Sequence, residues 1–189
     1  MKQVQIDTAR LLARSLLAAT LVSPHTAWAI ETIALVSPVT YSDKLVGNQK
    51  IKDECQVAGV VEDQLLYVLK KQAQGDDVQQ PASIPATGLA LRVTVMSIEG
   101  SGGGSWSGGK GMTVKTELFR DNRQIGSTTL ARTTLGGVWG NFNSTCTIVE
   151  RAALALAKET VKWASRVSAA RQENSDTKAE SSPDSGENK

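Results

Sequence analysis

Two glycine-rich runs carry the aromatic residues of this chain that are best suited to binding at a surface. Trp106 and Lys110 lie in the run GSGGGSWSGGKG, and Trp139 and Phe142 lie in or at the end of GGVWGNF. Glycine tolerates positive φ and loses much entropy on ordering, so a large aromatic side chain on such a run suggests a role in binding. Aromatic surfaces with few fixed charges suit protein partners or sugar rings. The alternative is that the tryptophans cap the open end of the core.

One nucleotide-binding pattern in these runs is explained by their glycine content. Gly104–Lys110 matches G-x-x-x-x-G-K, but Gly111 follows where a P-loop needs Ser or Thr for magnesium. The residues beyond it alternate as in a strand, whereas a P-loop is followed by a helix. We therefore expect no nucleotide and no other cofactor.

The first 29 residues have the layout of a secretory signal peptide. Basic residues precede a short apolar run, and the segment ends in Ala27-Trp28-Ala29, a small-x-small cleavage pattern. The apolar run is shorter than the ~20 residues of a membrane-spanning helix. A retained amphipathic helix is the alternative. We expect a periplasmic or secreted protein without a membrane span after cleavage.

Removal of that segment changes the chemistry open to the chain. His25 is the only histidine, so the mature chain would lack Ser-His-Asp and Cys-His catalysis and every histidine-based metal site. Three of the 21 basic and one of the 19 acidic residues also leave, so 18 of each remain. This balance gives no reason to expect nucleic acid as a partner.

The remaining functional groups are carboxylates and two cysteines. Several carboxylates could in principle form an acid/base pair, and Glu99 beside the first glycine-rich run is the one closest to the aromatic residues. A solvated face explains most of them, so we expect no enzyme and no metal site. Cys55 and Cys146 allow one intramolecular pairing, which we expect to form in an exported chain. Two reactive thiols are the alternative, without a C-x-x-C motif to support them. The other carboxylates considered are Asp53, Glu54, Glu62, Asp63, Glu117 and Glu150.

Hydrophobic periodicity predicts an α+β fold of order β-α-β-β-β-α. Apolar residues at three- and four-residue spacing predict an amphipathic helix over 48–74 and a second helix from Cys146 to about Val167. Alternation predicts strands over 89–96, 112–119 and 124–135, and a first strand over 31–40. The predicted domains are a signal peptide over 1–29, one α/β domain over 30–170 and a disordered polar tail over 171–189.

The predicted topology is a four-stranded mixed sheet with both helices on one face and one disulfide. The first helix makes a parallel crossover, and the last three strands form an antiparallel meander. Tracing these directions brings both glycine-rich runs and the starts of both helices to one end of the sheet. Cys55 and Cys146 then lie near each other, which agrees with the expected disulfide.

This element order, with a Gly/Trp-rich loop and an Ala-rich closing helix, resembles small periplasmic accessory domains over residues 31–168. Examples are the penicillin-binding-protein activator lipoproteins and the periplasmic domain of the curli secretion lipoprotein; other exported bacterial families fit equally well. The chain lacks their lipid-anchor cysteine. The resemblance implies a non-enzymatic role in the envelope. We therefore expect an accessory domain that binds an envelope protein through Trp106, Lys110, Trp139 and Phe142, with a glycan-binding module as the alternative and a carboxylate-dependent hydrolase as a third hypothesis.

Overall fold

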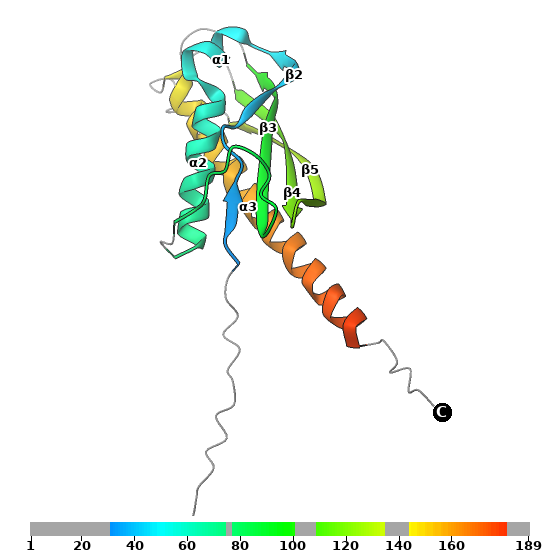
Figure 1. The fold of residues 1–189 in the computed structure, drawn as a ribbon. Helices are drawn as coiled ribbons and strands as arrows, with labels where there is room; N and C mark the ends of the chain where they lie inside the picture. The colour runs from blue at the N-terminus through cyan, green and yellow to red at the C-terminus, as the bar shows by residue number, and fades with distance from the viewer. Residues whose placement is uncertain (1–30, 75–76, 101–108, 135–143, 181–189) are drawn as a thin grey trace, which may run out of the picture.

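A computed structural model describes residues 31–74, 77–100, 109–134 and 144–180, with only the backbone of 175–180 (Figure 1). These residues form a mixed five-stranded sheet and three helices. The predicted α+β class, mixed sheet and disulfide are confirmed. The elements in chain order are β1 (Ile33–Leu35), β2 (Thr40–Gly47), α1 (Gln49–Cys55), α2 (Val57–Gln72), β3 (Leu89–Glu99), β4 (Lys110–Arg120), β5 (Arg123–Thr134) and α3 (Thr145–Glu180).

The three long strands form the expected antiparallel meander, in the order β3-β4-β5. Two residues, Asp121 and Asn122, connect β4 to β5 with φ of 50° and 61°. Positive φ at both central residues is typical of the type I′ hairpin turn, whose twist matches that of the strands. Asp121 also accepts a hydrogen bond from the Gly88 amide through Oδ1 (2.9 Å), which joins the turn to the start of β3.

The first edge of the sheet differs from the prediction, because two consecutive strands fill it. Both β1 and β2 run parallel to β3, β1 beside Leu89 to Leu91 and β2 farther along. Between them lies Pro38, which lacks the N–H that would continue the ladder. The predicted strand 31–40 is therefore broken, and β2 continues to Gly47, beyond the residues for which the sequence predicts a strand.

The predicted helix 48–74 is also broken, into α1 and α2. Gln56 separates them in the left-handed region, with φ 46° and ψ 53°, and gives α2 no side-chain cap. The Tyr41 hydroxyl of β2 supplies the missing acceptor, because the Ala58 amide donates to it at 3.0 Å. A tertiary contact therefore stabilises the start of α2, and the sequence around Gln56 gives no sign of it.

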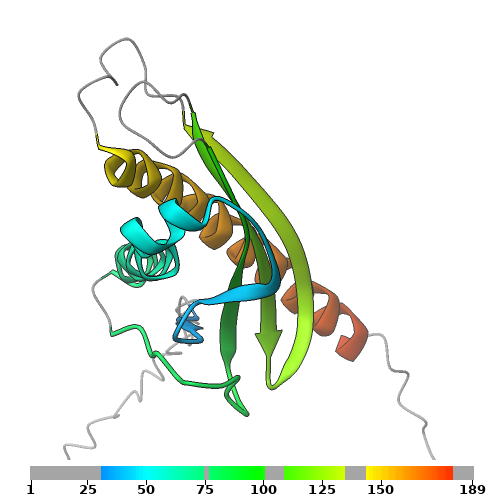
Figure 2. The same ribbon diagram turned by 90° about the horizontal axis from the view of Figure 1, so that it is seen from above.

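The helices cover one face of the sheet, as predicted (Figure 2). Alternate residues of β3, such as Leu91, Val93 and Val95, are fully buried against Leu65 of α2 and Leu156 of α3. Burial of such side chains contributes roughly 1.5–3 kcal/mol each. A smaller apolar cluster on the opposite face contains Ala34, Val36, Ala90 and Phe119, with Ile84 packed against it.

Helix α3 is longer than the sequence suggests. It continues to Glu180, whereas the sequence pattern predicts that the helix ends near Val167 and that a polar tail begins at residue 171. Extending a packed helix needs no new nucleation, and this polar stretch contains neither glycine nor proline. The predicted signal peptide and residues 181–189 lie outside the described residues. Of the helices described, none is long and apolar enough to cross a membrane.

Candidate functional site

The predicted binding residues fall on the boundary of the described structure. Trp106, Trp139 and Phe142 lie outside the described residues. Lys110 begins β4 and is 1 % exposed. It packs beside Gly100, where an added Cβ would lie 2.7 Å from the Lys110 Cδ. Its burial distinguishes Lys110 from the surface cation that the sequence suggests.

The described residues that flank the two glycine-rich runs lie at the same end of the sheet. We call them the loop platform, formed by Gly100 just after β3, Lys110 at the start of β4, Thr134 at the end of β5 and Ser144 just before α3. Strand register places Glu99 opposite Gly111 and Lys110 opposite Thr134. Neighbouring strands therefore anchor the first run at both ends and the second run at its beginning.

Asn48 joins α1 to the loop platform. Its Oδ1 accepts from the Ile51 amide at 3.1 Å, which caps the helix, and its Nδ2 donates to the Gly100 carbonyl at 2.9 Å. The backbone amide of Asn48 donates to the Ile98 carbonyl, also at 2.9 Å. One side chain therefore fixes both the start of α1 and the first residue of the first glycine-rich run.

The disulfide joins α3 to α1 at the platform. Cys55, the last residue of α1, is bonded to Cys146 in the first turn of α3, with their Cα atoms 5.2 Å apart. Ser144 caps α3, because its Oγ accepts from the Thr147 amide at 3.2 Å. The predicted pairing is confirmed, and it fixes the start of α3 against α1.

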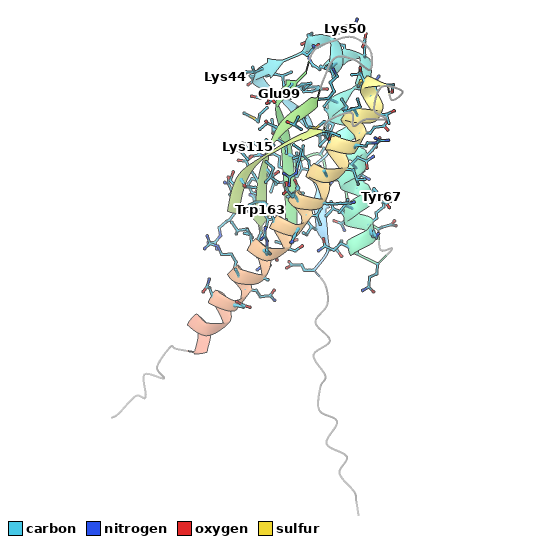
Figure 3. The ribbon with its side chains drawn as sticks, turned by 180° about the vertical axis from the view of Figure 1, so that it is seen from behind. Lys44, Lys50, Tyr67, Glu99, Lys115 and Trp163 are labelled. Carbon is cyan, nitrogen blue, oxygen red and sulfur yellow. A yellow bond between two sulfur atoms is a disulfide. The ribbon has the colours of Figure 1, made fainter. Side chains whose placement is uncertain are left out.

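The carboxylates considered for catalysis have mainly structural surroundings. Glu99 is exposed at the platform end of β3, near α1 (Figure 3). Glu62 of α2 accepts from the Val39 amide through Oε2 (2.8 Å) and from the Ser37 hydroxyl through Oε1, which clamps the chain on both sides of Pro38. Within the described part of the chain, no group of three or more acidic or cysteine side chains could hold a metal ion.

Glu117 lies in an ion-pair cluster on the open face of the sheet, where Figure 3 labels Lys115. Arg92 Nη2 is 2.9 Å from Glu117 Oε2, and Lys115 Nζ is 2.9 Å from Glu117 Oε1. Burial raises the pKa of the Glu117 carboxyl, but the hydrogen bonds and charges of Lys115 and Arg92 outweigh it. The pKa is therefore lowered from its ordinary value. The guanidinium of Arg92 also lies over the Phe119 ring, 4.9 Å from its centroid.

The structure contains a cavity at the other end of the sheet that the sequence did not reveal. This lower cavity has a volume of about 660 Å³, within the range of ~300–1,000 Å³ usual for small-molecule sites. Its residues come from β1, α2, β3, β4 and α3 and from the chain before β1, so no local motif marks them. They are Glu31, Ile33, Gln72, Leu89, Arg120, Ser165, Ser168, Ala169 and Gln172.

Hydrogen bonds connect the elements around the lower cavity. Arg120 Nη2 donates to Glu31 Oε2 at 2.7 Å and to Ser168 Oγ at 2.9 Å. Gln72 Nε2 donates to Ser165 Oγ at 2.8 Å, which joins α2 to α3. The Nε of Arg120 is buried and has no hydrogen-bond partner. Arg120, which lines the lower cavity, therefore combines a buried donor without a partner and an existing ion pair.

No family model matches the chain, and no curated protein matches its sequence. Among solved structures, it is similar to a protein of the family DUF330 from Xanthomonas campestris, with TM-score 0.46 and 14% identity over 75% of this chain and 99% of that one. It is also similar to a minor lipoprotein from Acinetobacter baumannii, with TM-score 0.41 and 17% identity over 72% and 94% of the two chains. The PelC dodecamer from Paraburkholderia phytofirmans gives TM-score 0.40 and 13% identity over 66% and 84%. At these similarities, any site or function must be argued from this chain's own residues.

Proposed function

We propose that this protein is an exported, non-catalytic accessory domain that binds an envelope protein at the loop platform. The binding groups are the side chains of Trp106, Trp139 and Phe142, carried on the two glycine-rich runs. Lys110 contributes from within the packed structure by supporting the start of β4.

The observation that carries the proposal is the common anchoring of both runs. Their described ends lie on the adjacent strands β3, β4 and β5 and at the start of α3. The Cys55–Cys146 disulfide and the hydrogen bonds of Asn48 fix α1 and α3 at the same end. Fixed anchor points lower the entropy lost when a run is ordered by a partner, and this preorganisation increases affinity.

The chemistry of the runs favours a protein surface as the partner. Tryptophan buries a large apolar area and keeps one N–H donor, which makes it frequent among the residues that dominate protein–protein affinity. The glycines allow the backbone to approach a partner closely. The sequence around the tryptophans contains one charged residue, Lys110, so little charge has to be desolvated on binding.

Pull-downs from envelope extracts with Trp106→Ala and Trp139→Ala test the proposal, with captured proteins identified by mass spectrometry. Tyr67→Ala is the matched control, because Tyr67 is 56% exposed on α2, away from the platform (Figure 3). We expect the partner retained by wild type and by the control to be lost with each tryptophan variant. Unchanged capture by both tryptophan variants would exclude this surface. Quenching of tryptophan fluorescence by a soluble peptidoglycan fragment would instead support the glycan-binding alternative.

A further inference from the structure

The lower cavity lies at the end of the sheet opposite the loop platform and has its own chemistry. Figure 1 shows the start of β1, the end of α2 and the middle of α3 together at this end. The apolar lining residues are the exposed Ala169 and the almost fully buried Ile33 and Leu89, and the polar groups come from Arg120 and its neighbours. A cavity of this kind suits a ligand with an apolar body and one polar head.

Arg120 determines which head group fits. A guanidinium presents its Nε and one Nη side by side, a geometry that matches the two oxygens of a carboxylate. In Arg120, Nη2 already donates to the carboxylate of Glu31, whereas Nε is buried without a partner. An unpartnered buried donor is costly, and a carboxylate that reaches both nitrogens would remove that cost. Glu31 thus occupies Nη2, one of the two nitrogens of Arg120 that a bidentate carboxylate would bind, and leaves Nε without a partner.

Glu31 is held weakly enough to be replaced. Its side chain is 42% exposed, and Arg120 is 21% exposed. Ion pairs with this much solvent contribute little to stability. The second Nη2 bond, to Ser168, comes from α3 and does not depend on Glu31. A competing carboxylate can therefore displace Glu31 while Ser168 still orients the guanidinium.

We propose that the lower cavity binds a small monocarboxylate with an apolar body. Its carboxylate replaces Glu31 on Arg120 and accepts from both Nε and Nη2. Its apolar body lies against Ile33, Leu89 and Ala169. Glu31 acts as an internal competitor, so removal of its charge tightens binding whereas removal of the guanidinium abolishes it.

Octanoate is the probe, added to the full chain and followed by calorimetry and by the ¹⁵N–¹H signal of the Arg120 Nε–H. We expect one site, a shift of that signal on binding, and affinity at least tenfold weaker for octanamide, which keeps the chain and loses the charge. Octylamine is not expected to bind. Equal affinity for octanoate and octanamide would refute a carboxylate site, and so would an Nε–H signal that octanoate leaves unchanged.

Variants with opposite expected effects complete the test. Arg120→Gln should weaken octanoate binding at least tenfold, whereas Arg123→Gln, the same change just across the turn and outside the cavity lining, should leave it unchanged. Glu31→Gln should tighten binding about two- to fivefold by removing the competitor. Ala169→Phe should weaken binding at least tenfold by filling the cavity, with the polar groups intact. Unaltered binding in Ala169→Phe, or weaker binding in Glu31→Gln, would overturn the proposal.

Discussion

The Cys55–Cys146 disulfide should provide a large part of the stability of the fold. It joins residues 91 positions apart. In the chain-entropy model, closing a loop of this length removes denatured-state entropy that amounts to about 4.6 kcal/mol at room temperature. Domains of this size are stable by roughly 5–15 kcal/mol in total. Loss of the cross-link should therefore remove about a third or more of the free energy of unfolding.

Urea unfolding of the oxidised protein, the reduced protein and the Cys55→Ala, Cys146→Ala and double variants measures this contribution. Each single variant breaks the same cross-link, so we expect each to lose about as much as the double variant, a strongly non-additive result. The slope of the free energy against urea should also rise, because an unlinked denatured chain exposes more surface. Losses that add between the two single variants, or a total below about 1 kcal/mol, would refute an origin in the cross-link.

Three further changes test individual contacts. Gly47→Ala should lower the free energy of unfolding, measured in urea, by about 3 kcal/mol. The φ of Gly47 is +127°, and the new Cβ would lie 1.9 Å from the carbonyl oxygen of Ile98, its partner in β3. A loss under about 1 kcal/mol would contradict this close approach. Gly126→Val should cost about 1–3 kcal/mol by overpacking, since an added Cβ already lies 3.2 Å from Trp163 Cζ2, whereas Ser127→Val on the exposed face should change little. The folded-state pKa of Glu117 is lowered, so its ion pairs stabilise the fold above the unfolded pKa of 4.5 and are lost as pH falls through the folded value. Wild type should therefore lose stability more steeply than Glu117→Gln on acidification below pH 4.5, and equal slopes would count against these ion pairs.

The sequence predicts the long antiparallel strands well because one of their faces is deeply buried. Leu89, Leu91, Val93 and Val95 alternate with partly exposed residues or with the small Ala90, and burial on one face of a sheet produces this pattern. The disulfide was predictable for a related reason. Once the strand directions are known, the topology brings the starts of both helical regions to the same end. Pattern and topology therefore suffice where the core determines the residue types.

The sequence fails where tertiary contacts determine the structure. The run TYSDKLVG shows no clear alternation, because β2 is an edge strand whose residues are mostly exposed or partly buried. The break at Gln56 depends on the Tyr41 hydroxyl, which is contributed by another element. The lower cavity is harder still to predict, since Arg120 obtains its partners Glu31 and Ser168 from opposite ends of the chain.

The two proposed sites lie along one helix, α3, the platform at its start and the lower cavity beside its residues 165–172. Cys146 at the platform and Ser168 at the lower cavity are 22 positions apart in α3, which at 1.5 Å per residue separates them by about 33 Å. A covalent bond holds the start of α3 at the platform, whereas beside the lower cavity α3 is held by the hydrogen bonds that Ser165 and Ser168 accept from Gln72 and Arg120. A ligand that displaces Glu31 therefore changes noncovalent contacts at the lower cavity and leaves the disulfide at the platform unchanged. Coupling to the platform would require α3 to move as a rigid body against α2 and β5, and the packing of Leu156 and Trp163 between the two ends opposes such a movement. The fold thus favours two independent sites.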